Sequence, residues 1–450
     1  MSKKNVREVA LDLLMQIEKN QAYSNLLLNQ TVNKEKLSTK DVGLLTEMVY
    51  GTIQRQAALD FFLTPFLKKG LDKLDLWVLV LLRLSCYQIV YLDRVPERAI
   101  IHEAVNIAKK RGHRGISGMV NGVLRSIQRE GVPSFDEITD SVERLAVETS
   151  HPEWMIKRWV RQFGEEDTKA MCEVNLTPPS VTVRVNSART TVKEMLVHLR
   201  EEGVTVEHGD LSSDAIKVVK GNVTHTNAFK NGLITIQDES SMLVGRALAP
   251  EQGMKVLDSC AAPGGKTTHL AELMDNLGHV TALDLHEHKV KLIQEQSDRL
   301  KLTNISPAKL DARKVREQFE EESFDRILVD APCSGLGVIR RKPDLKWAKK
   351  ESDLASIASI QQEILMAVAP LLKPGGRLVY STCTIDREEN QDVVNAFLAE
   401  NKSFRYDETL RERLPMSIQQ TKRLEEGSIT LLPNDFQTDG FFIASLQKVT

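Results

Sequence analysis

Residues Val256 to Leu270 read VLDSCAAPGGKTTHL, which is an apolar strand, a glycine turn and the beginning of a helix. In a doubly wound parallel sheet, ligands bind at the carboxyl ends of the strands, where the strand order switches. Gly264 and Gly265 would let the backbone come close to such a ligand. The turn is not GxGxxG, and Ser259 stands where a P-loop needs its first glycine. The stretch therefore predicts an α/β domain whose ligand is not bound by an ordinary nicotinamide or P-loop turn.

The segments around this stretch repeat its pattern. From about residue 231, apolar strands alternate with helices, and the strands read KVLDSC, HVTALDL, ISPAKLD, DRILVDA and RLVYSTC. Near-continuous apolar strands alternating with helices are typical of a parallel sheet covered on both faces. The tail, ITLLPNDFQTDGFFIASLQKV, has no helix between its last two strands, which predicts an antiparallel hairpin at the sheet. Residues 231–450 are therefore expected to form a Rossmann-like domain.

The remaining chain divides into two further parts. Residues 1–130 show apolar residues at helical spacing and are predicted to be all-α, whereas residues 145–230 show short strands around one helix, a small α+β linker domain. Residues 1–130 hold 20 lysines and arginines against 13 acidic residues, a net charge of +7, while residues 131–230 and 231–450 carry −4 and −5. A basic segment on an acidic chain indicates a polyanionic partner, although incidental charge on a solvated helical domain is the alternative.

The composition is that of a soluble globular protein, with 41% hydrophobic and 27% charged residues in a chain of 450. The five cysteines include no CxxC pair, so a disulfide framework or a zinc site is not expected, and reduced thiols fit a cytoplasmic location. No secretory signal is visible at the start. The most apolar stretch, Leu76 to Leu92, is interrupted by polar residues and predicts a buried core helix rather than a membrane span.

Acidic residues end three successive predicted strands, at Asp258, Asp284 and Asp311. A carboxylate in the second position can accept hydrogen bonds from both ribose hydroxyls of a nucleoside, and one in the third would lie near an adenine. Three such acids after a glycine turn predict a class I methyltransferase sheet that binds S-adenosylmethionine.

Two cysteines follow the ends of the next two predicted strands. Cys333 lies in DAPCSG and Cys383 in STCT. Carbon 5 of cytosine is a poor nucleophile, and a thiolate that adds to carbon 6 makes carbon 5 able to attack a methyl group. The cysteine in DAPCSG therefore indicates methylation of a carbon. The residues alone leave open whether one thiol attacks, both act, or both only pack.

These motifs and others along the chain resemble those of a known family, the Nop2/Sun-type RNA 5-methylcytosine methyltransferases. The motifs that carry the resemblance are QDESSMLV, DSCAAPGGKTTHLAEL, ALDL, DAPCSGLGVIRRKPDLKW, KPGGRLVYSTCT and DGFF, so it covers most of the chain. Residues 1–130 resemble NusB, an all-helical RNA-binding domain. The resemblance implies transfer of a methyl group from S-adenosylmethionine to carbon 5 of a cytosine in small-subunit (16S) ribosomal RNA.

The resemblance also implies roles for individual residues. Cys383 would be the nucleophile that forms a covalent adduct at carbon 6, and Cys333 would assist product release. The expected cofactor-binding residues are Cys260, Ala261, Ala262, Pro263, Gly264, Gly265, Lys266, Asp284, Asp311 and Asp330. Asp330 could also face the cytosine edge. Cys86 and Cys172 lie in no motif and are expected to pack in the core.

The segment RRKPDLKWAKK, from Arg340 to Lys350, holds six basic residues against one acid. Its position beside the expected catalytic loop predicts RNA phosphate contacts, with a solvated basic loop as the alternative. The candidates are Arg340, Arg341, Lys342 and Lys346, and Trp347 could stack or pack.

We expect a monomer that needs no metal and has no membrane contact. Two alternatives stay open at this stage. One is a non-catalytic RNA-binding assembly factor that retains the fold, and the other is a cytosine-5 methyltransferase that acts on another nucleic acid.

Overall fold

The computed structural model describes residues 5–20, 24–35 and 37–449, which form two compact units. The first unit contains the chain through Thr177 together with residues 339–351. The second contains residues 178–338 and 352–450. The three predicted parts are thus grouped into two, because the helices up to residue 175 pack with the N-terminal helices and the small sheet packs on the helices of the large sheet. The backbone N–H of Ala58, for example, donates to Ser150 Oγ at 3.0 Å.

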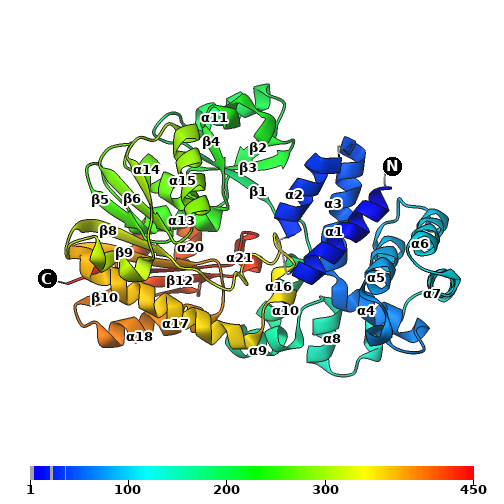
Figure 1. Ribbon diagram of the computed structural model, residues 1–450. Coiled ribbons are helices and arrows are strands. Elements are labelled where there is room, and N and C mark those ends of the chain that lie inside the picture. The colour runs from blue at the N-terminus through cyan, green and yellow to red at the C-terminus, as the bar shows by residue number, and fades with distance from the viewer. Residues whose placement is uncertain (1–4, 21–23, 36, 450) are drawn as a thin grey trace. The chain divides into compact units, whose positions relative to one another are not determined.

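The described part of the first unit is all-helical (Figure 1), which agrees with the all-α prediction for residues 1–130. Its helices are α1 (Val6–Asn20), α2 (Ser24–Glu35), α3 (Thr39–Gln54), α4 (Gln56–Leu63), α5 (Leu76–Tyr91), α6 (Glu97–Arg111), α7 (Arg114–Glu130), α8 (Ser141–Glu148), α9 (Glu153–Phe163), α10 (Glu165–Asn175) and α16 (Leu345–Ala348). Helix α5 lies in the core, with Leu81, Leu82 and Leu84 at most 1% exposed. The prediction of a core helix at this stretch is therefore confirmed. Cys86 and Cys172 are also fully buried in this unit, as expected.

The small sheet of the second unit has four antiparallel strands in the order β2-β3-β1-β4. These strands are β1 (Val181–Val185), β2 (Thr205–His208), β3 (Ala215–Lys220) and β4 (Ile234–Ile236), accompanied by α11 (Val192–Glu201) and α12 (Asn227–Lys230). Val183 and Val185 of β1 are buried, whereas Val181 at its start is 41% exposed. Arg184 on the opposite side of the strand is fully buried. The sheet extends beyond residue 230, because β4 pairs with β1.

The large sheet has the order β11-β12-β13-β9-β8-β5-β6-β7, with β10 paired to β13. Its strands are β5 (Lys255–Asp258), β6 (His279–Asp284), β7 (Ile305–Lys309), β8 (Phe324–Asp330), β9 (Leu372–Thr382), β10 (Phe404–Tyr406), β11 (Leu424–Glu425), β12 (Ser428–Leu431) and β13 (Phe441–Lys448). All neighbours among β5 to β9 are parallel, which confirms the five predicted strands. Strands β12 and β13 pair antiparallel, which confirms the predicted hairpin. The strand order switches between β5 and β8.

Helices cover both faces of this sheet, so the fold is doubly wound (Figure 1). The helices are α13 (Glu239–Leu248), α14 (Gly265–Leu273), α15 (Glu287–Leu300), α17 (Glu351–Val368) and α18 (Gln391–Glu400), with short helices α19 (Leu410–Arg413), α20 (Met416–Gln419) and α21 (Pro433–Phe436). Val256 packs with the apolar residues of α13 to α15, whereas its neighbour Leu257 packs with those of α17 and α18. Such alternation is expected of a strand buried on both faces.

Among the described residues, only Glu351–Leu371 has both the length and the apolar composition of a membrane-spanning helix. Within it, Leu354, Leu365 and Val368 are fully buried in this fold.

Candidate active site

The predicted site residues meet at the carboxyl edge of β8, β5, β6 and β7. Asp258 at the end of β5 lies beside Ala282 of β6 and Leu328 of β8 in the strand register. Asp284 ends β6 beside Lys309 of β7. Because these strands are parallel neighbours, the segments that follow them emerge along one edge at the switch in strand order.

The turn from Cys260 to Lys266 joins β5 to α14 at this edge. The backbone N–H of Ala261 donates to the Leu283 carbonyl at 2.8 Å, which fixes the turn against β6. Gly264 has φ +102°, and a Cβ there would lie 3.2 Å from the Cα of Ile293. Glycine is needed at this position both for its backbone conformation and for the close approach of α15. A Cβ on Gly265 would meet nothing nearer than Gln237 Nε2 at 3.7 Å, so the start of α14 is open to a ligand.

Asp258 has an unsatisfied oxygen at the base of this turn. Thr267 Oγ1 donates to Asp258 Oδ2 at 2.6 Å, while the buried Oδ1 has no hydrogen-bond partner among the described residues. Burial raises the pKa of Asp258 to about 7. An unsatisfied buried carboxylate oxygen is costly, and a ligand that supplies a donor or a positive charge would satisfy it. The residues present therefore fit a cationic ligand such as S-adenosylmethionine.

The two outer acids differ in their surroundings. Asp284 is 8% exposed, and its Oδ1 accepts the backbone N–H of His286 at 3.0 Å. Asp311 is held by Arg313, whose Nε and Nη2 donate to the carboxylate at 3.1 and 2.8 Å. The hydrogen bond and charge of Arg313 lower the pKa of Asp311. Arg313 was not predicted, and its place two residues after Asp311 is the signal that could have identified it.

The two candidate thiols face each other. Strands β8 and β9 are parallel neighbours with Asp330 beside Ser381, so Cys333 and Cys383 follow at the same edge. Their sulfur atoms are 3.3 Å apart and within hydrogen-bond distance. The hydrogen bond to Cys383, burial and the charges of Glu389 and Asp330 together hold the pKa of Cys333 well above its ordinary value. Cys333 is therefore held as a protonated thiol beside Cys383.

Lys266 and Asp330 form an ion pair next to these thiols. Lys266 Nζ donates to Asp330 Oδ2 at 2.8 Å, and Ser381 Oγ donates to Asp330 Oδ1 at 2.8 Å. Burial alone would lower the pKa of Lys266, but the charges of Asp330 and Cys383 raise it above the ordinary value. The ammonium also lies 4.9 Å from the ring centroid of Phe441, in the DGFF motif. A positive charge near Cys383 favours its thiolate form.

Buried polar residues that we did not predict lie beneath the site. Arg184 of β1 is fully buried, and its Nε and Nη2 donate to the two carboxylate oxygens of Glu272 at 2.7 and 2.9 Å. Its Nη1 donates to the Gly265 carbonyl at 2.7 Å, and Nη2 also donates to Thr268 Oγ1 at 3.0 Å. The small sheet is thus fixed to α14, the helix that follows the turn from Cys260 to Lys266. Glu389 and Asn390, also unpredicted, are fully buried after β9.

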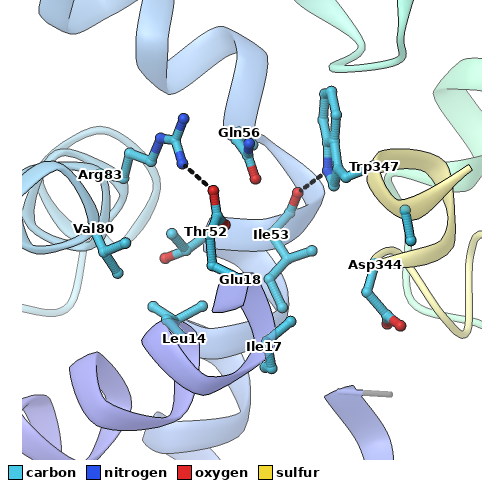
Figure 2. Close-up of a pocket in the computed structure, with 11 residues that line it drawn as sticks. Leu14, Ile17, Glu18, Thr52, Ile53, Gln56, Val80, Arg83, Asp344 and Trp347 are labelled. Carbon is cyan, nitrogen blue, oxygen red and sulfur yellow. Dashed lines mark hydrogen bonds and ion pairs between the residues drawn. The ribbon is translucent and has the colours of Figure 1, made fainter. Parts of the chain in front are cut away.

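The basic segment from Arg340 to Lys350 was expected to be an exposed phosphate-binding loop, but residues 343–346 within it are buried. Lys346 is fully buried within the helical unit, and its Nζ donates to the Gln54 carbonyl at 2.8 Å. Trp347 Nε1 donates to the Ile53 carbonyl at 2.8 Å, as Figure 2 shows. Lys346 cannot contact RNA from this position, so its prediction as an RNA ligand is wrong and Trp347 packs rather than stacks.

The other three basic candidates differ in exposure. Arg340 is also buried, at 9% exposed, and its Nε donates to the Thr177 carbonyl at 3.1 Å, which leaves little of its side chain for a phosphate. Arg341 and Lys342 are partly exposed. These two therefore stay as predicted phosphate contacts.

A cavity of about 220 Å³ lies beside this docked segment in the helical unit (Figure 2). Asp344 and Trp347 line one side of it, and Leu14, Ile17 and Val80 are among the apolar residues opposite. Arg83 lines it as well and pairs with Glu18 at 3.3 Å and Asp60 at 2.7 Å. The docked segment thus packs on α1, α3 and α5.

Within residues 5–20, 24–35 and 37–449, no group of three or more His, Cys, Asp or Glu side chains could hold a metal ion. All five cysteines are unbridged.

Three family descriptions match consecutive parts of the chain. Residues 4–129 match the NusB family, residues 151–224 match a ferredoxin-like domain described as Methyltr_RsmF/B-like, and residues 245–447 match the 16S rRNA methyltransferase RsmB/F family. These matches follow the order helical head, small α+β domain and Rossmann-like domain.

Full-length relatives give the same result. The chain is 56% identical over 448 residues to a Bacillus subtilis (strain 168) protein named "Probable ribosomal RNA small subunit methyltransferase B", with 100% of each chain covered. A Serratia proteamaculans (strain 568) protein named "Ribosomal RNA small subunit methyltransferase B" is 33% identical, with 99% of each covered.

Solved structures share the fold. A crystal structure of a protein designated PH0851 has a TM-score of 0.81 and 28% identity, and 99% of each chain is covered. A crystal structure of a methyltransferase homologue from Pyrococcus horikoshii has a TM-score of 0.58 and 28% identity, covering 69% of this chain and 100% of its own.

Proposed function

Because this chain belongs to the RsmB/F family of 16S rRNA methyltransferases, we propose that it methylates carbon 5 of one cytosine in small-subunit ribosomal RNA through a covalent cysteine adduct. The family accounts for methyl transfer to ribosomal RNA. Our proposal goes beyond the family in two respects, the choice of carbon 5 and the use of a thiol. The observation that carries them is the pair of thiols, 3.3 Å apart, beside the Lys266–Asp330 ion pair.

The methyl donor in this proposal is S-adenosylmethionine, which supplies an electrophilic methyl group when bound. The turn from Cys260 to Lys266 and the start of α14 would hold it, with Asp284 as acceptor for the ribose hydroxyls. The unsatisfied Oδ1 of Asp258 supports a cationic ligand at this turn. Asp311 already binds Arg313, so the adenine side of the site would include both residues.

Cytosine is activated by the protein in this proposal. Cys383 attacks carbon 6 as a thiolate, and carbon 5 becomes the nucleophile of an enamine. Lys266 favours the thiolate through its positive charge, and Cys333 stays protonated because its pKa is raised. After methyl transfer, solvent water accepts the proton from carbon 5, the C5–C6 double bond re-forms, and the Cys383 sulfur leaves as a thiolate. The protonated Cys333 assists this step by donating a hydrogen bond to the departing sulfur.

Asp330 would orient Lys266 and Ser381 beside the cytosine. Its two oxygens accept hydrogen bonds from Lys266 and Ser381, and its side chain is 25% exposed. A carboxylate held in this way can also accept a hydrogen bond from the exocyclic amine of cytosine. We therefore assign Asp330 to recognition of the cytosine edge as well as to the ion pair.

The basic head supports ribosomal RNA as the substrate. Its net charge of +7 provides a sequence-independent attraction to phosphates. Arg341 and Lys342 add two further positive charges in the segment that follows the Cys333 loop.

The proposal is tested by incubating the protein with S-adenosylmethionine carrying a tritiated methyl group and with unmodified 16S ribosomal RNA transcribed in vitro. We expect 5-methylcytosine at a single position. A methyl group on a different atom would contradict the cysteine mechanism. RNA binding without any methyl transfer would instead support the non-catalytic assembly factor.

A further inference from the structure

Glu389 and Asn390 are two buried polar residues that follow Cys383 in sequence and have no role in the proposed reaction. They follow β9 at the end of a short 3₁₀ turn, Arg387–Glu389. Both are fully buried. A buried carboxylate destabilises the fold unless donors surround it, so its partners indicate what it does.

Glu389 holds the loop that carries Cys333. Its Oε2 accepts the backbone N–H of Ser334 at 2.8 Å, and its Oε1 accepts the Ser334 hydroxyl. Gln361 Nε2 donates to Glu389 Oε2 at 3.1 Å and to the Pro332 carbonyl at 2.9 Å. The residues on both sides of Cys333 are therefore tied to one carboxylate.

Asn390 holds the loop that carries Cys383 in the same way. Thr382 Oγ1 donates to Asn390 Oδ1 at 2.6 Å, and Asn390 Nδ2 donates to the Thr384 carbonyl at 3.0 Å. Both neighbours of Cys383 are thus bound to one amide. The two loops are joined where the hydroxyl oxygens of Ser334 and Thr384 lie 3.0 Å apart.

We propose that Glu389 and Asn390 are positioning residues, Glu389 for Cys333 and Asn390 for Cys383, and that together they set the spacing of the two thiols. The proposal rests on the proposed function, since it assigns the two thiols to different steps. Neither side chain makes or breaks a bond in the reaction. Each acts through the cysteine whose neighbours it binds.

Because the two residues position different thiols, loss of each should slow a different step of the reaction. If Asn390 positions the nucleophile, its loss slows formation of the adduct at carbon 6. If Glu389 positions the thiol that assists release, its loss slows breakdown of the adduct, which then accumulates. A residue that only stabilised the fold would slow both steps alike.

The test compares Glu389→Gln and Asn390→Ala in single turnovers with tritiated S-adenosylmethionine and unmodified 16S ribosomal RNA. Adduct is measured by denaturing electrophoresis, and product as released methylated RNA. Since a displacement of about 1 Å can cost roughly 100-fold, we expect each affected step to slow by roughly 10- to 100-fold. Glu389→Gln should accumulate adduct, and Asn390→Ala should form it slowly without accumulation.

Two substitutions on α18 provide matched controls. Glu400→Gln and Asn395→Ala make the same chemical changes at exposed positions and should behave as wild type. Binding of S-adenosylhomocysteine by calorimetry checks that each variant is folded. If Glu389→Gln does not bind S-adenosylhomocysteine, Ser334→Ala takes its place in the test. This substitution removes only the hydroxyl that donates to Glu389, and the variant should also accumulate adduct.

Equal slowing of both steps in folded variants, or normal release by Glu389→Gln, would overturn the inference. Failure of the proposed function has a different signature, because the wild-type enzyme would then yield no 5-methylcytosine at all.

Discussion

Cys383 and Cys333 are chemically unequal although their sulfur atoms are only 3.3 Å apart. The pKa of Cys333 is raised by its hydrogen bond to Cys383, by burial and by nearby carboxylates, so it keeps its proton. Cys383 instead lies near the Lys266 ammonium, whose own pKa that proximity helps to raise. The positive charge of Lys266 beside Cys383 supports our proposal that this sulfur is the nucleophile.

At the residue scale, Cys383→Ala should abolish methyl transfer while the dissociation constant for S-adenosylmethionine changes by less than about twofold. In the proposed mechanism the thiol acts on the base, whereas the turn from Cys260 to Lys266 that would hold the cofactor lies between β5 and α14. Turnover measured with tritiated cofactor and calorimetry of cofactor binding give the two quantities. Cys86→Ala, which removes a thiol from the helical core, is the control and should retain activity. Near-normal turnover by Cys383→Ala would transfer the nucleophile's role to Cys333.

At the scale of secondary structure, Arg184 connects strand β1 of the small sheet to helix α14, which packs on the large sheet. Its guanidinium binds Glu272 through two hydrogen bonds of 2.7 and 2.9 Å, and both side chains are buried. Burial raises the pKa of Glu272, and the charge of Arg184 opposes that rise. The pair therefore holds the helix that begins at the cofactor turn.

Arg184→Met should lower the free energy of unfolding of the second unit by about 3–5 kcal/mol, because it leaves a buried carboxylate without its partner. All four tryptophans, Trp77, Trp154, Trp159 and Trp347, belong to the first unit. The second unit is therefore followed as the urea transition that appears in circular dichroism but not in tryptophan fluorescence. Arg184→Met/Glu272→Gln should recover part of the loss, and exposed Arg189→Met should cost much less. An unchanged transition in Arg184→Met would refute the role of the pair.

Docking of residues 339–351 on the helical unit should depend on pH through Lys346. Burial lowers the pKa of Lys346 from 10.5 to about 7. At a pH between these two values, Lys346 is neutral in the folded protein but still protonated in the unfolded chain. The unfolded state then binds one more proton than the folded state, so the free energy of unfolding rises with pH from about 7 toward 10. Below about pH 7 Lys346 is protonated in both states, and this slope disappears. Urea unfolding followed by tryptophan fluorescence at pH 7, 8 and 9 should show this rise in wild type and in Lys349→Met, but not in Lys346→Met. A rise of equal size in Lys346→Met would exclude Lys346 as its cause.

The same elements show what the sequence could and could not predict. Strand ends and motifs were predictable, because Asp258, Asp284, Cys333 and Cys383 each follow an apolar run. Lys346 was misassigned because a basic segment looks exposed unless its packing partners are known. Arg184, Glu389 and Asn390 were missed for the converse reason. Their hydrogen-bond partners lie far away in sequence or in other loops, and a buried polar residue has no local signature.

At the scale of the whole molecule, we propose that the basic head contributes phosphate contacts to RNA binding. Part of its charge is internally paired, since Lys110 binds Glu8 at 2.9 Å and Arg111 binds Asp12 at 2.6 Å. Lys109 and Arg114, at the adjacent ends of α6 and α7, are exposed. The number of phosphates neutralised by the head should therefore be smaller than its count of basic residues.

Lys109→Ala/Arg114→Ala should weaken RNA binding and reduce the slope of log K against log salt by about 1.5, since each lost phosphate contact removes about 0.7–0.9. The rate at saturating RNA should stay unchanged, because neither residue belongs to the catalytic unit. Filter binding over a range of salt concentrations measures the slope. Lys193→Ala/Lys220→Ala removes the same charge from α11 and β3 and should have less effect. Equal slopes for the head variant and wild type would show that these two residues do not contact phosphate.

The proposed mechanism depends on which of the two sulfur atoms, that of Cys383 or that of Cys333, bonds to the cytosine. The most direct measurement is mass spectrometry of the protein–RNA adduct formed by Cys333→Ala with S-adenosylmethionine and unmodified 16S ribosomal RNA. We predict that this variant accumulates an adduct stable to denaturation, with a methylated cytidine attached to the peptide that contains Cys383, and that Cys333→Ala/Cys383→Ala forms none. An adduct in Cys383→Ala whose nucleotide is attached to Cys333 would contradict the account.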